Sequence, residues 1–186
     1  MLDKLLEWDK DIFIYLNNLG TEQYDAVWIV ITKFNTWLPL FIGLGILILL
    51  KNSRKEILGI FLALISMLLL VTLAIFLTKN GVQRLRPSND IAMDGLIRAV
   101  ISPSDFSFFS GHAASSFSIA MFAVFFLRKK VRWIYIILIW PLLFCFSRIY
   151  LGVHYLSDII VGAAVGTLFA YLFYRIYEKL SVLYLK

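Results

Sequence analysis

Long apolar runs separated by short polar segments are the dominant pattern of this chain. Several runs approach the ~20 residues that a helix needs to cross the hydrocarbon core of a bilayer. We expect spans in the ranges 22–50, 57–77, 113–127, 133–146 and 156–174. The pattern therefore predicts an all-α, polytopic membrane bundle with about five transmembrane helices. The length of the chain allows a single domain, residues 1–186.

The N-terminal segment, residues 2–18, has a different pattern. Apolar side chains fall near one face of a helix, with Asp9 as an exception. The apolar members are Leu2, Leu5, Leu6, Ile12, Phe13 and Leu16. This stripe is too mixed to span a bilayer, and it predicts an amphipathic helix at the membrane interface. A polar patch at residues 32–36 leaves open whether residues 22–35 belong to the first span or form a separate helix.

Composition supports the membrane interpretation. The chain is 61% hydrophobic, whereas soluble domains are ~45–50% apolar. Its net charge of +6 could suggest a nucleic-acid partner. The basic residues, however, cluster at the ends of apolar runs, where they orient spans or meet anionic headgroups. We therefore expect the membrane and a lipid as partners, and no nucleic acid.

Two basic loops, residues 51–55 and 128–132, predict the orientation. Five spans would place them on the same side as a C-terminal tail that includes Lys179 and Lys186. The positive-inside rule assigns this side to the cytoplasm. The long polar connection at residues 78–110 then faces the periplasm or exterior of the cytoplasmic (inner) membrane. A connection of this length in so small a protein is often functional.

Four ionisable residues mark the ends of spans on the side of this loop. Lys79 ends the second span and His112 begins the third. Arg148 ends the fourth and His154 begins the fifth. Each is a weak signal alone, because charged residues are ordinary at helix ends, where they anchor to headgroups. Together they form a cationic cluster that contains both histidines of the chain.

Asp158 adds a carboxylate to this cluster. In a helix that begins near His154, it lies one turn further on the same face. It can accept a hydrogen bond from one imidazole nitrogen, which leaves the other nitrogen free to attack. Arg148 offers a planar fork suited to phosphate oxygens. A helix cap beside a snorkelling arginine is the plainer interpretation, and this stretch alone does not decide between the two.

Two further segments could bind an anion. Residues 79–87 carry Lys79, Arg84 and Arg86. Ser110 can cap a helix that begins near Gly111, and the exposed N–H groups of a helix start suit an anion. Taken separately, headgroup anchoring and a plain cap are the simpler interpretations.

Taken together, these residues match a known pattern. The chain contains Lys79-x6-Arg86-Pro87, then Ser110-Gly111-His112, then Ser147-Arg148-x5-His154-x3-Asp158. In order and helix-end placement this resembles the three-part signature of the type 2 phosphatidic acid phosphatase (PAP2) superfamily, over residues 79–158. That superfamily contains membrane lipid phosphatases and is related to soluble vanadium haloperoxidases. One departure is Phe109, where the family usually has proline.

The resemblance implies a role for each residue. His154 would attack phosphorus and form a phosphohistidine, with Asp158 orienting it. His112 would protonate the leaving oxygen and then activate water. The phosphoryl oxygens would be held by Lys79, Arg86, Arg148, the Ser110 hydroxyl and the Gly111 amide. Fixed donors suffice for phosphoryl transfer, so we expect no cofactor. Metal ligation by the histidines and Asp158 is the alternative, but three nearby cations argue against a further one.

We therefore expect a membrane hydrolase, a lipid-phosphate phosphatase, whose substrate has its tails in the bilayer and its phosphate at the interface. Undecaprenyl diphosphate is our first choice. Lipid A phosphates, phosphatidylglycerophosphate and phosphatidic acid are alternatives that no residue excludes. A vanadate-dependent haloperoxidase is disfavoured by the apolar spans, and a non-catalytic lipid carrier by the two histidines with Asp158. The oligomeric state is left open.

Four residues outside the signature carry lesser expectations. Arg84 and Arg98 match no signature position, and we expect solvated loop charges or headgroup contacts. Gly162 and Gly166, on the last span, permit close helix packing. We expect that packing inside the bundle rather than at a dimer seam.

Overall fold

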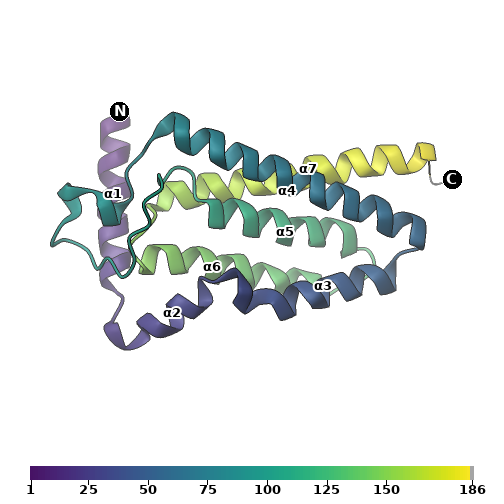
Figure 1. Cartoon of the computed structure of the whole chain (residues 1–186), viewed down its shortest axis with the longest axis horizontal. Coiled ribbons are helices and arrows are strands. Elements are labelled where there is room, and N and C mark those ends of the chain that lie inside the picture. Colours follow the sequence, from purple (N-terminus) through teal and green to yellow (C-terminus); the bar gives the residue numbers. More distant parts are fainter. Residues whose placement is uncertain (185–186) are drawn as a thin grey trace.

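The computed structural model describes residues 1–184, and this part of the chain is helical with no strand. Its α-helices are α1 (Leu2–Asn18), α2 (Asp25–Ile31), α3 (Leu38–Lys51), α4 (Arg54–Val82), α5 (Gly111–Leu127), α6 (Ile139–Tyr150) and α7 (Leu156–Tyr184). Short 3₁₀ turns accompany them: η1 (Glu22–Tyr24), η2 (Phe34–Trp37), η3 (Pro87–Asn89), η4 (Ile91–Met93) and η5 (Ile134–Leu138). Helices α3 to α7 run along the bundle, and α1 crosses one end of it (Figure 1). The all-α prediction is confirmed.

Three stretches of the described chain are long and apolar enough to cross a membrane. They are Phe34–Lys51, Arg54–Met93, which contains α4, and Leu156–Val182, within α7. The helical stretches Gly111–Leu127 and Ile134–Tyr150 are apolar but shorter. A membrane bundle is thus supported, whereas the number of five spans stays a prediction.

The N-terminal part of the first expected span is a separate element. Helix α2 ends at Ile31, and α3 begins only at Leu38, after η2. Across this break the Thr36 hydroxyl donates to the Val30 carbonyl (2.6 Å), and the Trp37 indole donates to the Ile31 carbonyl (2.8 Å). These side chains satisfy carbonyl groups that the last turn of a helix leaves unpaired. The polar patch therefore closes a junction between two helices.

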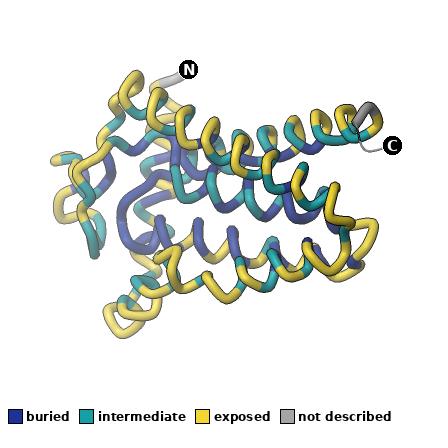
Figure 2. The backbone as a smooth tube through the Cα atoms, turned by 45° about the vertical axis from the view of Figure 1, so that its right-hand side comes forward, coloured by how far each residue is buried: buried dark blue, intermediate teal, exposed yellow. Residues whose placement is uncertain are grey.

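Helix α5 lies at the centre of the bundle and packs most extensively against α7. In Figure 2 the buried backbone runs along the middle of the bundle, and the outer coils are exposed. Two glycines of α7 make the close packing of α7 against α5 possible. A Cβ at Gly162 would lie 2.6 Å from the Ser110 carbonyl oxygen, and one at Gly166 would overlap the Ala114 carbonyl. The prediction that these glycines pack inside the bundle is confirmed.

The two basic loops meet at the end of the bundle that lies away from α1. Lys130 pairs with Glu56 (3.5 Å) and donates to Asn52 (2.6 Å). Helix α7 is longer than expected, because the segment from Arg175, predicted to be a polar tail, continues the helix to Tyr184. Lys186, counted among the basic residues of this side, lies outside the described residues.

Helix α1 is confirmed as a helix, and one of its faces packs against the bundle. Asp9, Phe13 and Asn17 face the bundle and are buried. Three residues of the apolar stripe, Leu5, Leu6 and Ile12, are exposed, and so is the neighbouring Trp8. A helix that lies across the bundle with apolar side chains outward suits a membrane interface. The interfacial position itself stays a prediction.

Candidate active site

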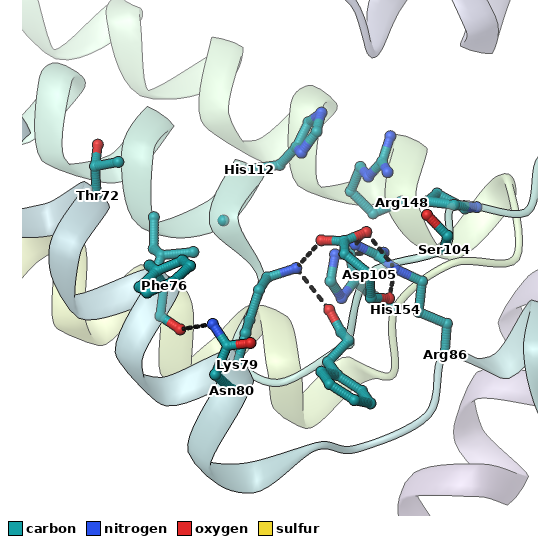
Figure 3. Close-up of a pocket in the computed structure, with 14 residues that line it drawn as sticks. Thr72, Phe76, Lys79, Asn80, Arg86, Ser104, Asp105, His112, Arg148 and His154 are labelled. Carbon is teal, nitrogen blue, oxygen red and sulfur yellow. Dashed lines mark hydrogen bonds and ion pairs between the residues drawn. The ribbon is translucent and has the colours of Figure 1, made fainter.

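A pocket of about 630 Å³ opens at the α1 end of the bundle (Figure 3). Most of the expected site residues line it: Lys79, Arg86, Gly111, His112, Arg148 and His154. Asp158 and Ser110 are fully buried behind it. The structure therefore brings together residues that are far apart in the sequence, since Lys79 and Asp158 are separated by 79 positions.

Helix ends and one tight turn position these side chains. Lys79 lies in the last turn of α4, His112 in the first turn of α5, and Arg148 in the last turn of α6. The chain then turns at Gly152, whose φ of +82° favours glycine. A Cβ at Gly152 would also lie 2.7 Å from the Arg98 carbonyl oxygen. This turn returns His154 to the pocket beside Arg148.

The hydrogen bonds of His154 define which nitrogen faces the pocket. Arg86 Nη1 lies 3.0 Å from Nε2, and a guanidinium can only donate, so Nε2 accepts. The proton is therefore on Nδ1, which lies 3.1 Å from the Ser107 hydroxyl and 3.4 Å from Asp158 Oδ2. Burial lowers the pKa of His154 to about 3, Arg86 adds to this effect, and Asp158 opposes it. The imidazole is consequently neutral at physiological pH, with a lone pair on the pocket side.

Asp158 is held by several donors behind His154. Its Oδ2 accepts from the Tyr155 backbone N–H (3.0 Å) and from the Ser107 hydroxyl. Its Oδ1 accepts from Arg84 Nη1 at 2.8 Å. The expected pairing of His154 with Asp158 is present, and Ser107 lies between them as a second route for the Nδ1 proton. Ser107 has no counterpart in the sequence prediction.

His112 and Arg148 face the pocket from its other side. The His112 ring lies against Phe34 and Phe144, with ring centroids 5.7 and 4.8 Å away. Arg148 Nη1 donates to the Thr32 hydroxyl (2.5 Å), and its Nε is buried without a partner among the described residues. A buried donor without a partner is costly. Arg148 therefore has hydrogen-bonding capacity to offer a phosphate oxygen.

A carboxylate on the loop occupies part of this cationic pocket. Asp105 pairs with Lys79 Nζ (2.5 Å) and with Arg86 Nη2 (2.8 Å), as Figure 3 shows. Burial alone would raise the pKa of Asp105, but the Lys79 hydrogen bond and the charges of Arg86 and Lys79 lower it. The carboxylate is therefore ionised, and it lies where an anionic ligand would bind. Asp105 matches no position of the signature, so the sequence did not predict this contact.

The start of α5 departs from expectation in the position of Ser110. The buried Ser110 hydroxyl accepts from the Ala113 N–H (3.3 Å), so it caps α5 without lining the pocket. Its contact with a phosphate oxygen stays a prediction. Phe109, which stands where the family usually has proline, is 4% exposed and packs in the core. Its aromatic ring fills space inside the bundle.

The expectation that Arg84 and Arg98 are solvated or bind headgroups is wrong. Arg84 pairs with Asp158 and Asp9, both at 2.8 Å. Arg98 pairs with Asp25 at 2.9 Å. Each arginine joins segments far apart in the chain, and spacing along the sequence gives no sign of such pairs.

Apolar side chains of α4 form the remaining wall of the pocket. Ile75 and Phe76 lie one turn before Lys79, and Thr72 extends the wall further along the helix. Pockets that bind small ligands combine an apolar lining with a few placed polar groups. The pocket therefore suits a ligand that is anionic at one end and apolar at the other.

Membrane-length helices that bring three cations and both histidines to one pocket fit a membrane phosphatase. The profile of the PAP2 superfamily matches residues 59–181, and the chain belongs to this superfamily. It is an integral membrane hydrolase of the lipid phosphatase class.

Relatives with known names align over most of the chain. Lipid A 4′-phosphatase of Bacteroides thetaiotaomicron is 31% identical, covering 97% of this chain and 82% of its own. Undecaprenyl-diphosphatase of Sulfolobus acidocaldarius is 30% identical, covering 87% and 75%. The crystal structure of a PAP2 type phosphatidylglycerolphosphate phosphatase from Bacillus subtilis superposes with a TM-score of 0.72 at 24% identity. That match covers 95% of this chain and 87% of the other, and it shows a shared fold.

Proposed function

We propose that this protein releases phosphate from a lipid phosphate or diphosphate at the outer face of the cytoplasmic membrane, through a phosphohistidine on His154. One observation supports this most strongly. Three cations, Lys79, Arg86 and Arg148, line the same pocket as both histidines. Fixed cations and donors around the phosphoryl group supply most of the catalysis in phosphoryl transfer.

The first half-reaction transfers the phosphoryl group to the enzyme. The lone pair on His154 Nε2 forms a bond to phosphorus, and the bond from phosphorus to the lipid-side oxygen breaks. Burial and the charge of Arg148 lower the pKa of His112 to about 2, so His112 takes up a proton from water when the anionic phosphate binds beside it. As the general acid, it then gives this proton to the lipid-side oxygen. Asp158 stabilises the positive charge that develops on the His154 ring, and the three cations stabilise the phosphoryl oxygens.

The second half-reaction regenerates the enzyme. His112, now neutral, takes a proton from a water molecule, whose oxygen attacks the phosphohistidine. The bond from phosphorus to Nε2 breaks, and inorganic phosphate leaves. The neutral His154 returns to its hydrogen bond with Arg86.

Lipid A phosphate and undecaprenyl diphosphate are the two leading substrates. Undecaprenyl diphosphate fits an outward-facing site that recycles a lipid carrier, and a relative with 30% identity bears that activity in its name. Lipid A phosphate now stands first, because the relative named for it aligns over 97% of this chain. The apolar wall of Ile75 and Phe76 accepts lipid chains of either kind.

The test is phosphate release by the purified protein from a panel of lipids. The panel contains lipid A bisphosphate, undecaprenyl diphosphate, phosphatidylglycerophosphate and phosphatidic acid. We expect His154→Ala to abolish turnover and the acid-trapped phosphoenzyme. We expect His112→Ala to lose about 10²–10⁴-fold, the usual cost of a missing general acid, and to recover relative activity on an aryl phosphate.

Arg128→Ala provides the matched control. This exposed cation lies at the other end of α5, and its loss should leave turnover unchanged. Release of phosphate from no panel lipid would contradict the proposed function. A phosphohistidine trapped at His112 instead of His154 would contradict the assignment of roles.

A further inference from the structure

Behind His154, a chain of ion pairs leads away from the pocket to helix α1. Asp158 is fully buried, and its Oδ1 accepts from Arg84 Nη1. The other end of the same guanidinium, Nη2, donates to Asp9 Oδ2 at 2.8 Å. Arg84 thus joins two carboxylates, one beside the expected nucleophile and one on α1. Neither Arg84 nor Asp9 lines the pocket.

Asp9 also binds the first turn of α7 directly. Its Oδ1 accepts from the Ser157 backbone N–H at 2.9 Å, and its Oδ2 accepts from the Ser157 hydroxyl. Arg84 Nη1 donates to the same hydroxyl at 2.8 Å, and its guanidinium lies 3.9 Å from the centre of the Tyr155 ring. These contacts fix the fork of Arg84 from several directions.

We propose that Arg84 and Asp9 form a positioning pair that holds Asp158 in the orientation that directs Oδ2 toward His154. This inference rests on the proposed function, in which His154 Nε2 attacks phosphorus. Arg84 occupies Oδ1 and so leaves Oδ2 for His154 and Ser107. Asp9 holds the guanidinium and balances its charge.

Physical reasons favour a pair over a single arginine. A buried carboxylate needs a partner to remain charged. An arginine with only Asp158 to bind could swing toward the polar loop, because its side chain carries rotamer entropy. Asp9 removes that freedom, because the guanidinium then donates Nη1 to Asp158 and Nη2 to Asp9, and charge-assisted hydrogen bonds hold both of its ends. Helix α1 therefore contributes to the orientation of Asp158 and His154 without lining the pocket.

The test is a double-mutant cycle on the purified protein, using lipid A bisphosphate and undecaprenyl diphosphate as probes. We expect Arg84→Gln to lower kcat about 10–100-fold with KM unchanged. This is the range for residues that orient the histidine ligands of metal sites, which act, as Arg84 would, through a hydrogen-bonded partner. Arg84→Lys should recover part of the loss. Asp9→Asn should lower kcat about fivefold, but it should have no further effect in the Arg84→Gln background.

A pair of the same kind elsewhere serves as the control. Asp25 pairs with Arg98 at 2.9 Å and joins the N-terminal segment to the loop without contacting Asp158. Asp25→Asn should lower thermal stability as Asp9→Asn does, but leave kcat unchanged. The rate of phosphoenzyme formation in a single turnover should fall only in the Arg84 and Asp9 variants.

Several outcomes would overturn the inference. A rise in KM with unchanged kcat in Arg84→Gln would make Arg84 a substrate contact. A fivefold effect of Asp9→Asn that persists in the Arg84→Gln background would show that Asp9 acts independently. A wild type that hydrolyses neither probe nor any other lipid of the panel would contradict the proposed function, and this inference with it. A wild type that is active while Arg84→Gln keeps its kcat would contradict this inference alone.

Discussion

Asp105 shows how much a single residue changes the site. Its carboxylate pairs with Lys79 and Arg86, which are two of the cations expected to bind phosphate. Its side chain is 56% exposed, so it can move toward solvent when an anion arrives. A bound phosphate must therefore displace Asp105 or share these cations with it.

We expect Asp105→Asn to lower both KM for the lipid phosphate and the inhibition constant of inorganic phosphate. An exposed ion pair is worth up to about 1 kcal/mol, which corresponds to about fivefold. The pKa of Asp105 lies below its ordinary value, so the carboxylate is charged and the difference should persist throughout the neutral pH range. Asp94→Asn, an exposed acid on the same loop, should change neither constant. A rise in KM would show that Asp105 orients Arg86 for the substrate.

Some residue contacts could be predicted from spacing, and others could not. The separation of four positions between His154 and Asp158 predicts their pairing once a helix is placed there. Ser107 contacts the same two residues across 47 and 51 positions, through a loop whose path no local pattern specifies. For the same reason the sequence does not predict the ion pairs of Arg84 with Asp9 and Asp158. Such contacts depend on the conformation of residues 83–110.

At the scale of elements, the break between α2 and α3 contributes to the site. The apolar runs predict most helices well, because each run must hide its backbone in the bilayer. The polar patch at residues 32–36 was ambiguous, since hydrophobic periodicity does not show whether polar residues interrupt a helix or line a pocket. In the structure this junction places Thr32 against Arg148.

We expect Thr32→Val to weaken substrate binding. The variant removes the acceptor for Arg148 Nη1, and a hydrogen bond to a charged group contributes about 1.5–3 kcal/mol. A tenfold or larger fall in kcat/KM on the panel lipids should follow, because Arg148 loses its orientation. Thr32→Ser keeps the hydroxyl and should restore most of the activity. A loss of activity in the serine variant with none in the valine variant would instead indicate that the methyl group and its packing matter.

At the scale of the whole molecule, two ends of the bundle carry different chemistry. The pocket, the long loop and α1 lie at one end, and the basic loops with the C-terminal part of α7 lie at the other (Figure 1). The order of apolar runs predicts this separation, because each run reverses the direction of the chain. The sequence could not place α1, because its position against the bundle depends on the buried polar residues Asp9 and Asn17, and nothing in the sequence distinguishes them from the exposed polar residues of the same helix.

The different chemistry of the two ends leads to a prediction about the orientation of the protein in the membrane. The loops at 51–55 and 128–132 carry clustered basic residues, and the positive-inside rule places them in the cytoplasm. The buried Cys145 is first replaced by alanine, and one new cysteine is then introduced at an exposed position of either end. We expect Ala92→Cys, on the loop beside the pocket, to react with a membrane-impermeant maleimide in intact cells. Lys129→Cys should react only after the cells are opened. The reverse pattern would place the pocket in the cytoplasm, and the substrate would then have to come from the inner leaflet.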